Sequence, residues 1–153
     1  MTQTIARTMP FVHDDGGRAD AGYKGIAAGD CVCRAAAIVT GRPYQEIYDL
    51  INELGRAERV GPTGKRSRST ARTGVYKDTT RKLMAELGLT WTPTMGIGTG
   101  CTVHLRPGEL PMGRLVASVT KHIVAVIDGT IHDIDPGVSR DGTRCVYGYW
   151  SAS

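Results

Sequence analysis

The stretch from Gly29 to Thr40, GDCVCRAAAIVT, decides the fold and raises a chemical question. An aspartate and a cysteine stand where an almost wholly apolar run begins. Asp30 is a good N-cap, because its carboxylate can accept hydrogen bonds from the free N–H groups of a first helical turn. Apart from Arg34 the run is apolar all round, which is typical of a buried helix. We therefore predict a central buried helix that carries Cys31 at its first position.

The chain around this helix has the size and composition of one globular domain. Its 153 residues suit a single core, and 41% of them are hydrophobic and 22% charged. No apolar run approaches the roughly 20 residues that span a bilayer. The N-terminus shows no apolar core of the signal-peptide type. We expect one domain over residues 1–153, in the cytoplasm and without membrane contact, with an irregular N-terminal arm over residues 1–24.

Two further helices are predicted after the buried one. The first begins at Pro43, a favoured first helical residue, and is stopped by Gly55. The second covers residues 75–87. Their apolar positions share one face each and are predicted to contact the core. These positions are Tyr44, Ile47, Tyr48, Ile51 and Leu54 in the first helix, and Val75, Leu83, Met84 and Leu87 in the second.

The chain after Gly88 is predicted to form an antiparallel sheet. Its clearest element is the hairpin KHIVAVIDGTIHDID, residues 121–135, whose Asp128-Gly129 turn is typical of type I′ geometry. Helices followed by strands imply an α+β domain in which a sheet of about four to six strands packs on the helices. The other strand candidates are residues 89–95, 101–105, 113–119 and 143–150.

The position of Cys31 favours a nucleophile. A thiol at a helix N-terminus feels the positive end of the macrodipole, which lowers its pKa and raises its thiolate fraction. The carboxylate of Asp30 opposes this effect, and Arg34 is four residues further on, close enough to neutralise that carboxylate. The alternative is that Cys31 is a small buried packing residue, which is common for free cysteine.

The hairpin supplies a candidate base. If the turn sets the register, Ile127 pairs with Thr130, and counting outward places His122 on one face of the ribbon with Asp133 and Asp135. One of the two aspartates can then orient the imidazole, which is the third role in a catalytic triad. His132 falls on the opposite face and is discounted.

The order of these residues resembles that of a known superfamily. A cysteine at the start of a buried helix, a histidine on a strand and an aspartate on the next strand follow one another in papain-like cysteine hydrolases. The compact form, with HIVAV and a strand ending in Asp-Pro, is similar to the double-glycine type of cysteine peptidase that processes bacteriocins. The resemblance implies a papain-like fold and a thiol protease triad of Cys31, His122 and Asp133, with Asp135 as the alternative acid.

A second resemblance covers more of the chain. The segment from Pro93 to Trp150, and nearly the full chain from about Gly22, is similar to a family of phage and bacterial proteins. That resemblance implies a phage protein acting in the host cytoplasm and brings no activity with it. The papain-like pattern also has a gap here, because the residues before the nucleophile, YKGIAAGD, lack the glutamine or asparagine that usually helps to form the oxyanion hole.

A flexible basic loop is predicted over residues 56–74, because Gly, Pro, Ser, Thr and Arg dominate it. Between Arg56 and Lys82 there are nine Lys or Arg and only two acids. This patch is either a solvated loop or a surface for an acidic partner or nucleic acid, although only Tyr76 supplies the aromatic interleaving that nucleic-acid readers usually show. The candidate substrate- or partner-binding residues are Arg34, Lys65, Arg66, Arg68 and Arg72.

The remaining cysteines are expected to be reduced, with Cys33, Cys101 and Cys145 as packing residues. A zinc site built from these cysteines, Cys31 and His104 is disfavoured, because one Cys-x-Cys pair lacks a partner pair. The sequence therefore predicts a cysteine peptidase or amidase that needs no cofactor and acts on a peptide, isopeptide or other amide bond. The alternatives are an acyl transferase that uses the same thiol, and a phage-type binding protein that acts through the basic loop.

Overall fold

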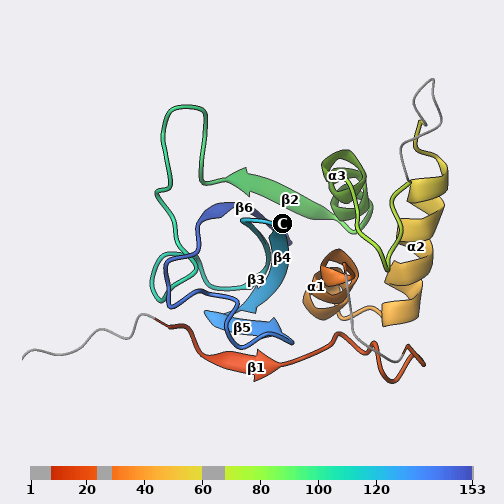
Figure 1. Ribbon diagram of the computed structural model, residues 1–153, viewed down its shortest axis with the longest axis horizontal. Helices are drawn as coiled ribbons and strands as arrows, with labels where there is room; N and C mark the ends of the chain where they lie inside the picture. The colour runs from red at the N-terminus through yellow and green to blue at the C-terminus, as the bar shows by residue number, and fades with distance from the viewer. Residues whose placement is uncertain (1–7, 24–28, 60–67, 153) are drawn as a thin grey trace, which may run out of the picture.

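The protein is described here by a computed structural model, which covers residues 8–23, 29–59 and 68–152. A mixed sheet curls around one side of the molecule, and the helices pack on its outer side (Figure 1). The α+β class predicted from the sequence is therefore confirmed. The helices are α1 (Cys31–Thr40), α2 (Tyr44–Arg56) and α3 (Lys77–Glu86). The strands are β1 (Phe11–His13), β2 (Leu89–Pro93), β3 (Arg114–Val119), β4 (His122–Ile127), β5 (Thr130–Asp133) and β6 (Val146–Ala152).

The strand order is β1-β5-β4-β3-β6-β2, and only the contact between β1 and β5 is parallel. The predictions of an irregular arm over residues 1–24 and of a purely antiparallel sheet are therefore wrong at β1. The three residues of this strand pair with Ile131 to Asp133. A strand of that length is too short to show the alternation by which strands are recognised in a sequence.

Helix α1 spans the predicted residues and is almost completely buried. It ends at Gly41, whose left-handed backbone (φ 72°) lets its N–H donate to the carbonyl of Ala37 at 2.9 Å. At the other end the N-cap prediction is only half right. Asp30 occupies the N-cap position, but its side chain makes no capping hydrogen bond.

Gly55 does not end α2, which continues to Arg56. A Cβ atom at Gly55 would lie 2.0 Å from the carbonyl oxygen of Ser69, so the glycine permits a close approach of the following chain. Residues 68–74, which were expected to be flexible, are held against α2 by hydrogen bonds. Thr70 and Gly74 exchange two backbone hydrogen bonds, and the amide of Ala71 donates to Asn52 Oδ1 at 2.9 Å.

The central strands of the sheet, β3 and β4, are buried on both faces. One core lies between the sheet and the helices and includes α1, Val116 and Ala125. The other lies under the long loops that cover the inner side of the curled sheet in Figure 1, and it joins Val124 and Val126 to Leu105. Within the described residues, no helix combines the length and the apolar character needed to cross a membrane.

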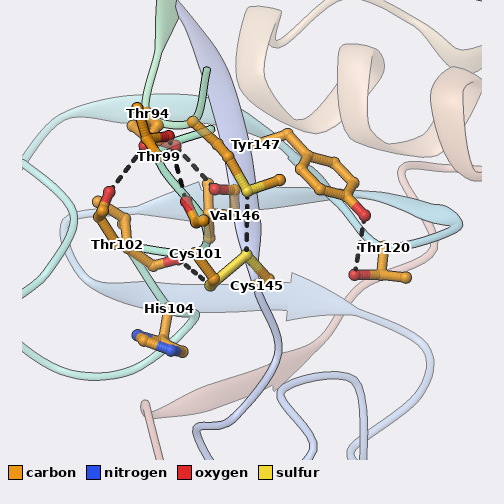
Figure 2. The surroundings of a disulfide bond; sticks show 12 residues. Thr94, Thr99, Cys101, Thr102, His104, Thr120, Cys145, Val146 and Tyr147 are labelled. Carbon is orange, nitrogen blue, oxygen red and sulfur yellow. Dashed lines mark hydrogen bonds between the residues drawn. A yellow bond between two sulfur atoms is a disulfide. The ribbon is translucent and has the colours of Figure 1, made fainter. Parts of the chain in front are cut away.

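The loop side of the sheet carries a disulfide bond between Cys101 and Cys145 (Figure 2). The expectation that these thiols are reduced is therefore wrong. Their Cα atoms are 5.9 Å apart although 44 residues separate them in sequence. The predicted strand 101–105 is also absent, since only an isolated bridge joins His104 to Cys145. The segment nonetheless runs beside the start of β6, because the amide of Val146 donates to Val103 O at 2.9 Å.

Candidate active site

The first residue of α1 and the first residue of β4 meet at the edge of the helix-side core. Cys31 is partly buried, and its thiol lies close enough to the imidazole of His122 for the two groups to change each other's pKa. The helix packs directly on β4, which fixes the two residues relative to each other. The pair that the sequence predicted is thus brought together.

The hairpin register places an aspartate on the other side of the imidazole. Ile127 pairs with Thr130 as predicted. At the open end of the hairpin, His122 Nε2 lies 2.9 Å from Asp133 Oδ2. Because Nε2 faces the carboxylate, Nδ1 is the ring nitrogen that remains for the thiol. Asp133 is only 3% exposed, so water does not compete for this contact.

The two alternatives for the acid are separated by their contacts. Asp135 is exposed, and its Oδ1 accepts a hydrogen bond from the amide of Gly137 at 2.9 Å, which is a local turn interaction. His132, which the register discounted, contacts Asp14 Oδ2 through Nδ1 at 3.3 Å. Among these residues it is Asp133 that contacts His122.

The electrostatics of the three groups favour a thiolate–imidazolium pair. Burial raises the pKa of the Cys31 thiol, but the hydrogen bond and charge of His122 outweigh it and hold this pKa below its ordinary value. Burial lowers the pKa of His122, but its hydrogen bonds to Asp133 and Cys31 raise it to about 9. Burial raises the pKa of Asp133, but the hydrogen bonds from His122 and from the amide of Ile134, together with the charges of His122 and Arg34, lower it below its ordinary value. The acid is therefore ionised and stabilises the imidazolium.

Arg34, expected to bind substrate or partner, lies inside the protein. It is 5% exposed, and its guanidinium pairs with Asp30 and, at 3.4 Å, with Asp133. This position excludes the surface role that was predicted for it. The predicted neutralisation of Asp30 is present as an i,i+4 ion pair.

Cys33 is chemically distinct from Cys31. It is completely buried, and burial raises the pKa of its thiol to about 12. Its Sγ donates to the carbonyl of Tyr44 at 3.7 Å. A thiol in this environment stays protonated and packs as a small hydrophobic group, as predicted.

The basic segment reaches the vicinity of Cys31 through its backbone. A Cβ atom at Gly29 would lie 2.7 Å from the carbonyl oxygen of Thr73 and 3.3 Å from that of Arg72, so this turn packs two residues before Cys31. The side chains of Arg68 and Arg72 are exposed. The other two candidates, Lys65 and Arg66, lie outside the described residues.

The zinc alternative loses two of its donors, because Cys101 and Cys145 are joined to each other. Across residues 8–23, 29–59 and 68–152, no group of three or more His, Cys, Asp or Glu is arranged to hold a metal ion.

Sequence reasoning missed a support for the turn before His122. Arg144 donates to the carbonyls of Val138, at 3.1 Å, and Thr120. Thr120 also contacts the hydroxyl of Tyr147 at 3.4 Å, as Figure 2 shows. The disulfide at Cys145 fixes the neighbouring chain. No local sequence pattern predicts these contacts, because Thr120 is distant in sequence from both of its partners.

Comparisons with protein-family models, curated proteins and solved structures find no match to this chain. Inference about function therefore rests on the geometry of the site.

Proposed function

We propose that this protein is a cysteine hydrolase that cleaves a peptide, isopeptide or other amide bond through Cys31, His122 and Asp133. The observation that carries the proposal is that one imidazole interacts with the thiol of Cys31 on one side and lies 2.9 Å from the carboxylate of Asp133 on the other. Nucleophile, base and orienting acid come from three different elements, α1, β4 and β5. This is the arrangement by which thiol hydrolases activate their nucleophile.

The acylation step begins from the thiolate of Cys31. Its sulfur attacks the carbonyl carbon of the amide, and the carbonyl π electrons move to the oxygen. When the tetrahedral intermediate collapses, the C–N bond breaks, and the imidazolium of His122 gives its proton to the leaving amine. The product is a thioester between the substrate acyl group and Cys31.

Deacylation reverses these roles. Neutral His122 takes a proton from water, whose oxygen attacks the thioester carbon, and the C–S bond breaks to release the acid and the thiolate. Asp133 holds the imidazole in the orientation and tautomer that both steps require. An amine or alcohol in place of water gives acyl transfer by the same residues.

The oxyanion formed in each step needs hydrogen-bond donors. The main-chain N–H of Cys31 is one candidate, because the first N–H groups of a helix lack intrahelical acceptors and point out of its N-terminal end. The segment YKGIAAGD supplies no side-chain amide, and residues 24–28 within it lie outside the described residues. A second donor has to come from main chain or from another element.

The proposal is tested with p-nitrophenyl acetate, a generic acyl donor. The Cys31 thiolate should displace p-nitrophenolate, giving a burst of one equivalent and an acetyl group on Cys31 by mass spectrometry, followed by slow turnover. Cys33→Ala is the matched control and should keep the burst, whereas Cys31→Ala should abolish it. A wild-type protein that reacts no faster than free cysteine at the same pH would contradict the proposal.

Exposed cations favour a second candidate, binding of an acidic partner. In the described parts of residues 56–82 the exposed charged side chains include one acid, Asp78, because Glu58 is partly buried and bonds to Ser69 and Thr79. The exposed cations are Arg56, Arg59, Arg68, Arg72, Lys77, Arg81 and Lys82.

This candidate predicts salt-sensitive binding to a short DNA duplex, with an affinity that falls linearly on a log–log plot against salt. Replacing Arg68 and Arg72 with serine should weaken the binding and flatten that slope. The same change at Arg42, an exposed arginine paired with Glu46, should not. Binding that is insensitive to salt, or equally weakened by all three changes, contradicts this candidate.

A further inference from the structure

Two buried carboxylates beside the site share the guanidinium of Arg34. Asp30 is 2% exposed and Asp133 is 3% exposed. Arg34 pairs through Nη1 with Asp30 Oδ1, and its Nη2 lies 3.4 Å from Asp133 Oδ1. One of these acids directly precedes the nucleophile, and the other orients the base. The guanidinium therefore links the acid next to Cys31 with the acid next to His122.

The contacts close into a ring. Cys31 interacts with His122, His122 bonds to Asp133, Asp133 to Arg34, and Arg34 to Asp30, which is covalently joined to Cys31. The formal charges alternate around this ring when the thiolate and imidazolium are present. A planar guanidinium suits the bridging position, because it offers several donors in a fixed fork.

The carboxylate oxygens are all engaged. Asp133 Oδ2 faces His122, while its Oδ1 accepts from the amide of Ile134 at 2.9 Å and from Arg34. On the other acid, Asp30 Oδ2 accepts from the hydroxyl of Tyr44 at 2.9 Å and lies 3.4 Å from Arg18 Nε. Rotation of either carboxylate would break contacts on both of its oxygens.

We propose that Arg34 is a positioning residue of the site, which holds the Asp133 carboxylate against His122 and offsets the charge of Asp30 beside Cys31. This role rests on the proposed hydrolase function. Arg34 contacts no substrate in it and acts through the two acids.

The role has a measurable electrostatic consequence. Without the guanidinium, the carboxylate of Asp30 opposes the thiolate at the next residue, and Asp133 loses a contact that keeps it ionised and in place. Both effects favour the neutral thiol. Charged and titratable groups also reach Cys31 or Asp30 from the surrounding elements, and they remain in the variant. These groups are His122 on β4, Arg144 before β6, Arg18 in the N-terminal segment and Tyr44 on α2, and Asp133 on β5 acts through His122.

The test is the pH dependence of Cys31 alkylation by iodoacetamide in a Cys33→Ala background. Arg34→Met should move the reactivity profile upward by about one pH unit, the lower end of the shifts that a nearby opposite charge produces. At a pH where the wild-type rate still rises with pH, this shift corresponds to a roughly tenfold lower rate constant of alkylation. Arg34→Lys, which keeps the charge without the fork, should give an intermediate profile.

Arg114→Met is the matched control. Arg114 also donates to α1, through Nε to Val39 O at 2.7 Å and through Nη2 to Ile38 O at 2.6 Å, but at the opposite end of the helix. Its loss should lower the thermal stability without moving the profile. Equal shifts in the Arg34 and Arg114 variants would show a purely structural effect and overturn the positioning role.

The remaining outcomes separate the two proposals. An unchanged profile in Arg34→Met, beside a wild-type plateau that His122→Ala abolishes, overturns the role of Arg34 and leaves the hydrolase standing. An ordinary thiol profile in the wild type overturns both. If Arg34→Met does not fold, Asp30→Asn replaces it. Removing that charge should shift the profile to lower pH, and an unchanged or higher profile contradicts the account.

Discussion

Cys31 and Cys33 lie two residues apart on one helix and differ in almost every chemical respect. Cys31 is partly buried, and the neighbouring His122 lowers the pKa of its thiol. Cys33 is fully buried against the carbonyl of Tyr44, and its pKa is raised to about 12. Two positions along a helix correspond to a rotation of about 200°, so the side chains face different surroundings.

The comparison shows which influence moves the pKa values of the two thiols in opposite directions. Both cysteines lie in the first turn of α1, so the helix macrodipole acts on both. What separates them is the neighbouring imidazole on one side and the dry core on the other. The lowered pKa of Cys31 therefore comes from tertiary contacts, and each prediction below changes one side of this contrast.

The largest expected effect is the loss of Cys31 itself. Cys31→Ser should lower the rate of substrate acylation below detection, because a serine at this position lacks the acidity of the thiol. Cys33→Ala should keep the wild-type rate within a few-fold. The measurement is acylation by p-nitrophenyl acetate, and comparable losses in the two variants would break the contrast.

The acid behind the imidazole should come next. Asp133→Asn removes the charge that stabilises the imidazolium and is expected to cost about 10³–10⁴ in kcat, the size found when the acid of a triad is replaced by its amide. Asp135→Asn is the matched control, since Asp135 is exposed and holds only a turn. Steady-state kinetics of the two variants on the same acyl donor decide the point. A larger loss in the Asp135 variant would reassign the acid.

The disulfide on the other face of the sheet should affect stability rather than reactivity. Closing a loop of 44 residues is expected to contribute about 4 kcal/mol to the free energy of unfolding. Urea denaturation of a Cys101→Ala, Cys145→Ala double variant measures this contribution. Alkylation of Cys31 in the same variant should keep its pH profile. A shifted profile would mean that loss of the disulfide disturbs the Arg144 contact with Thr120 and, through it, the position of His122.

The smallest expected effect is a polar change at the buried cysteine. Cys33→Ser places a hydroxyl in the core and should destabilise the fold by about 1–3 kcal/mol if that hydroxyl finds no good partner. Acylation at Cys31 should be unchanged. Cys33→Ala is the comparison variant, and a serine variant as stable as the alanine variant would show that the Tyr44 carbonyl satisfies the hydroxyl.

Parts of this architecture could be predicted because their signals are local. The apolar run after Cys31 specifies a buried helix, and the Asp128-Gly129 turn specifies the hairpin register that brings His122 to the acids. Both depend on residues within a few positions of one another. The choice between Asp133 and Asp135 needed the structure, because both lie on the same face of the ribbon.

Other parts depend on contacts between distant segments. The pairing of Cys101 with Cys145 and the parallel pairing of β1 with β5 join residues that no spacing rule connects. The charge of Arg34 suggests an exposed side chain, and only the fold shows that it lies between two buried carboxylates. Gly55 has the pattern of a helix stop, but its lack of a side chain instead permits the approach of Ser69.

The central claim is tested most directly by the rate of Cys31 alkylation against pH, in Cys33→Ala and in Cys33→Ala with His122→Ala. With His122 present, reactivity should rise to a plateau well below about pH 8, because the imidazolium stabilises the thiolate, and the ion pair should persist until the histidine titrates near pH 9. Without His122 the thiol should titrate near about pH 8.5 or above. The same profile in both proteins, without a low-pH plateau, would contradict the thiolate–imidazolium pair and the proposed hydrolase.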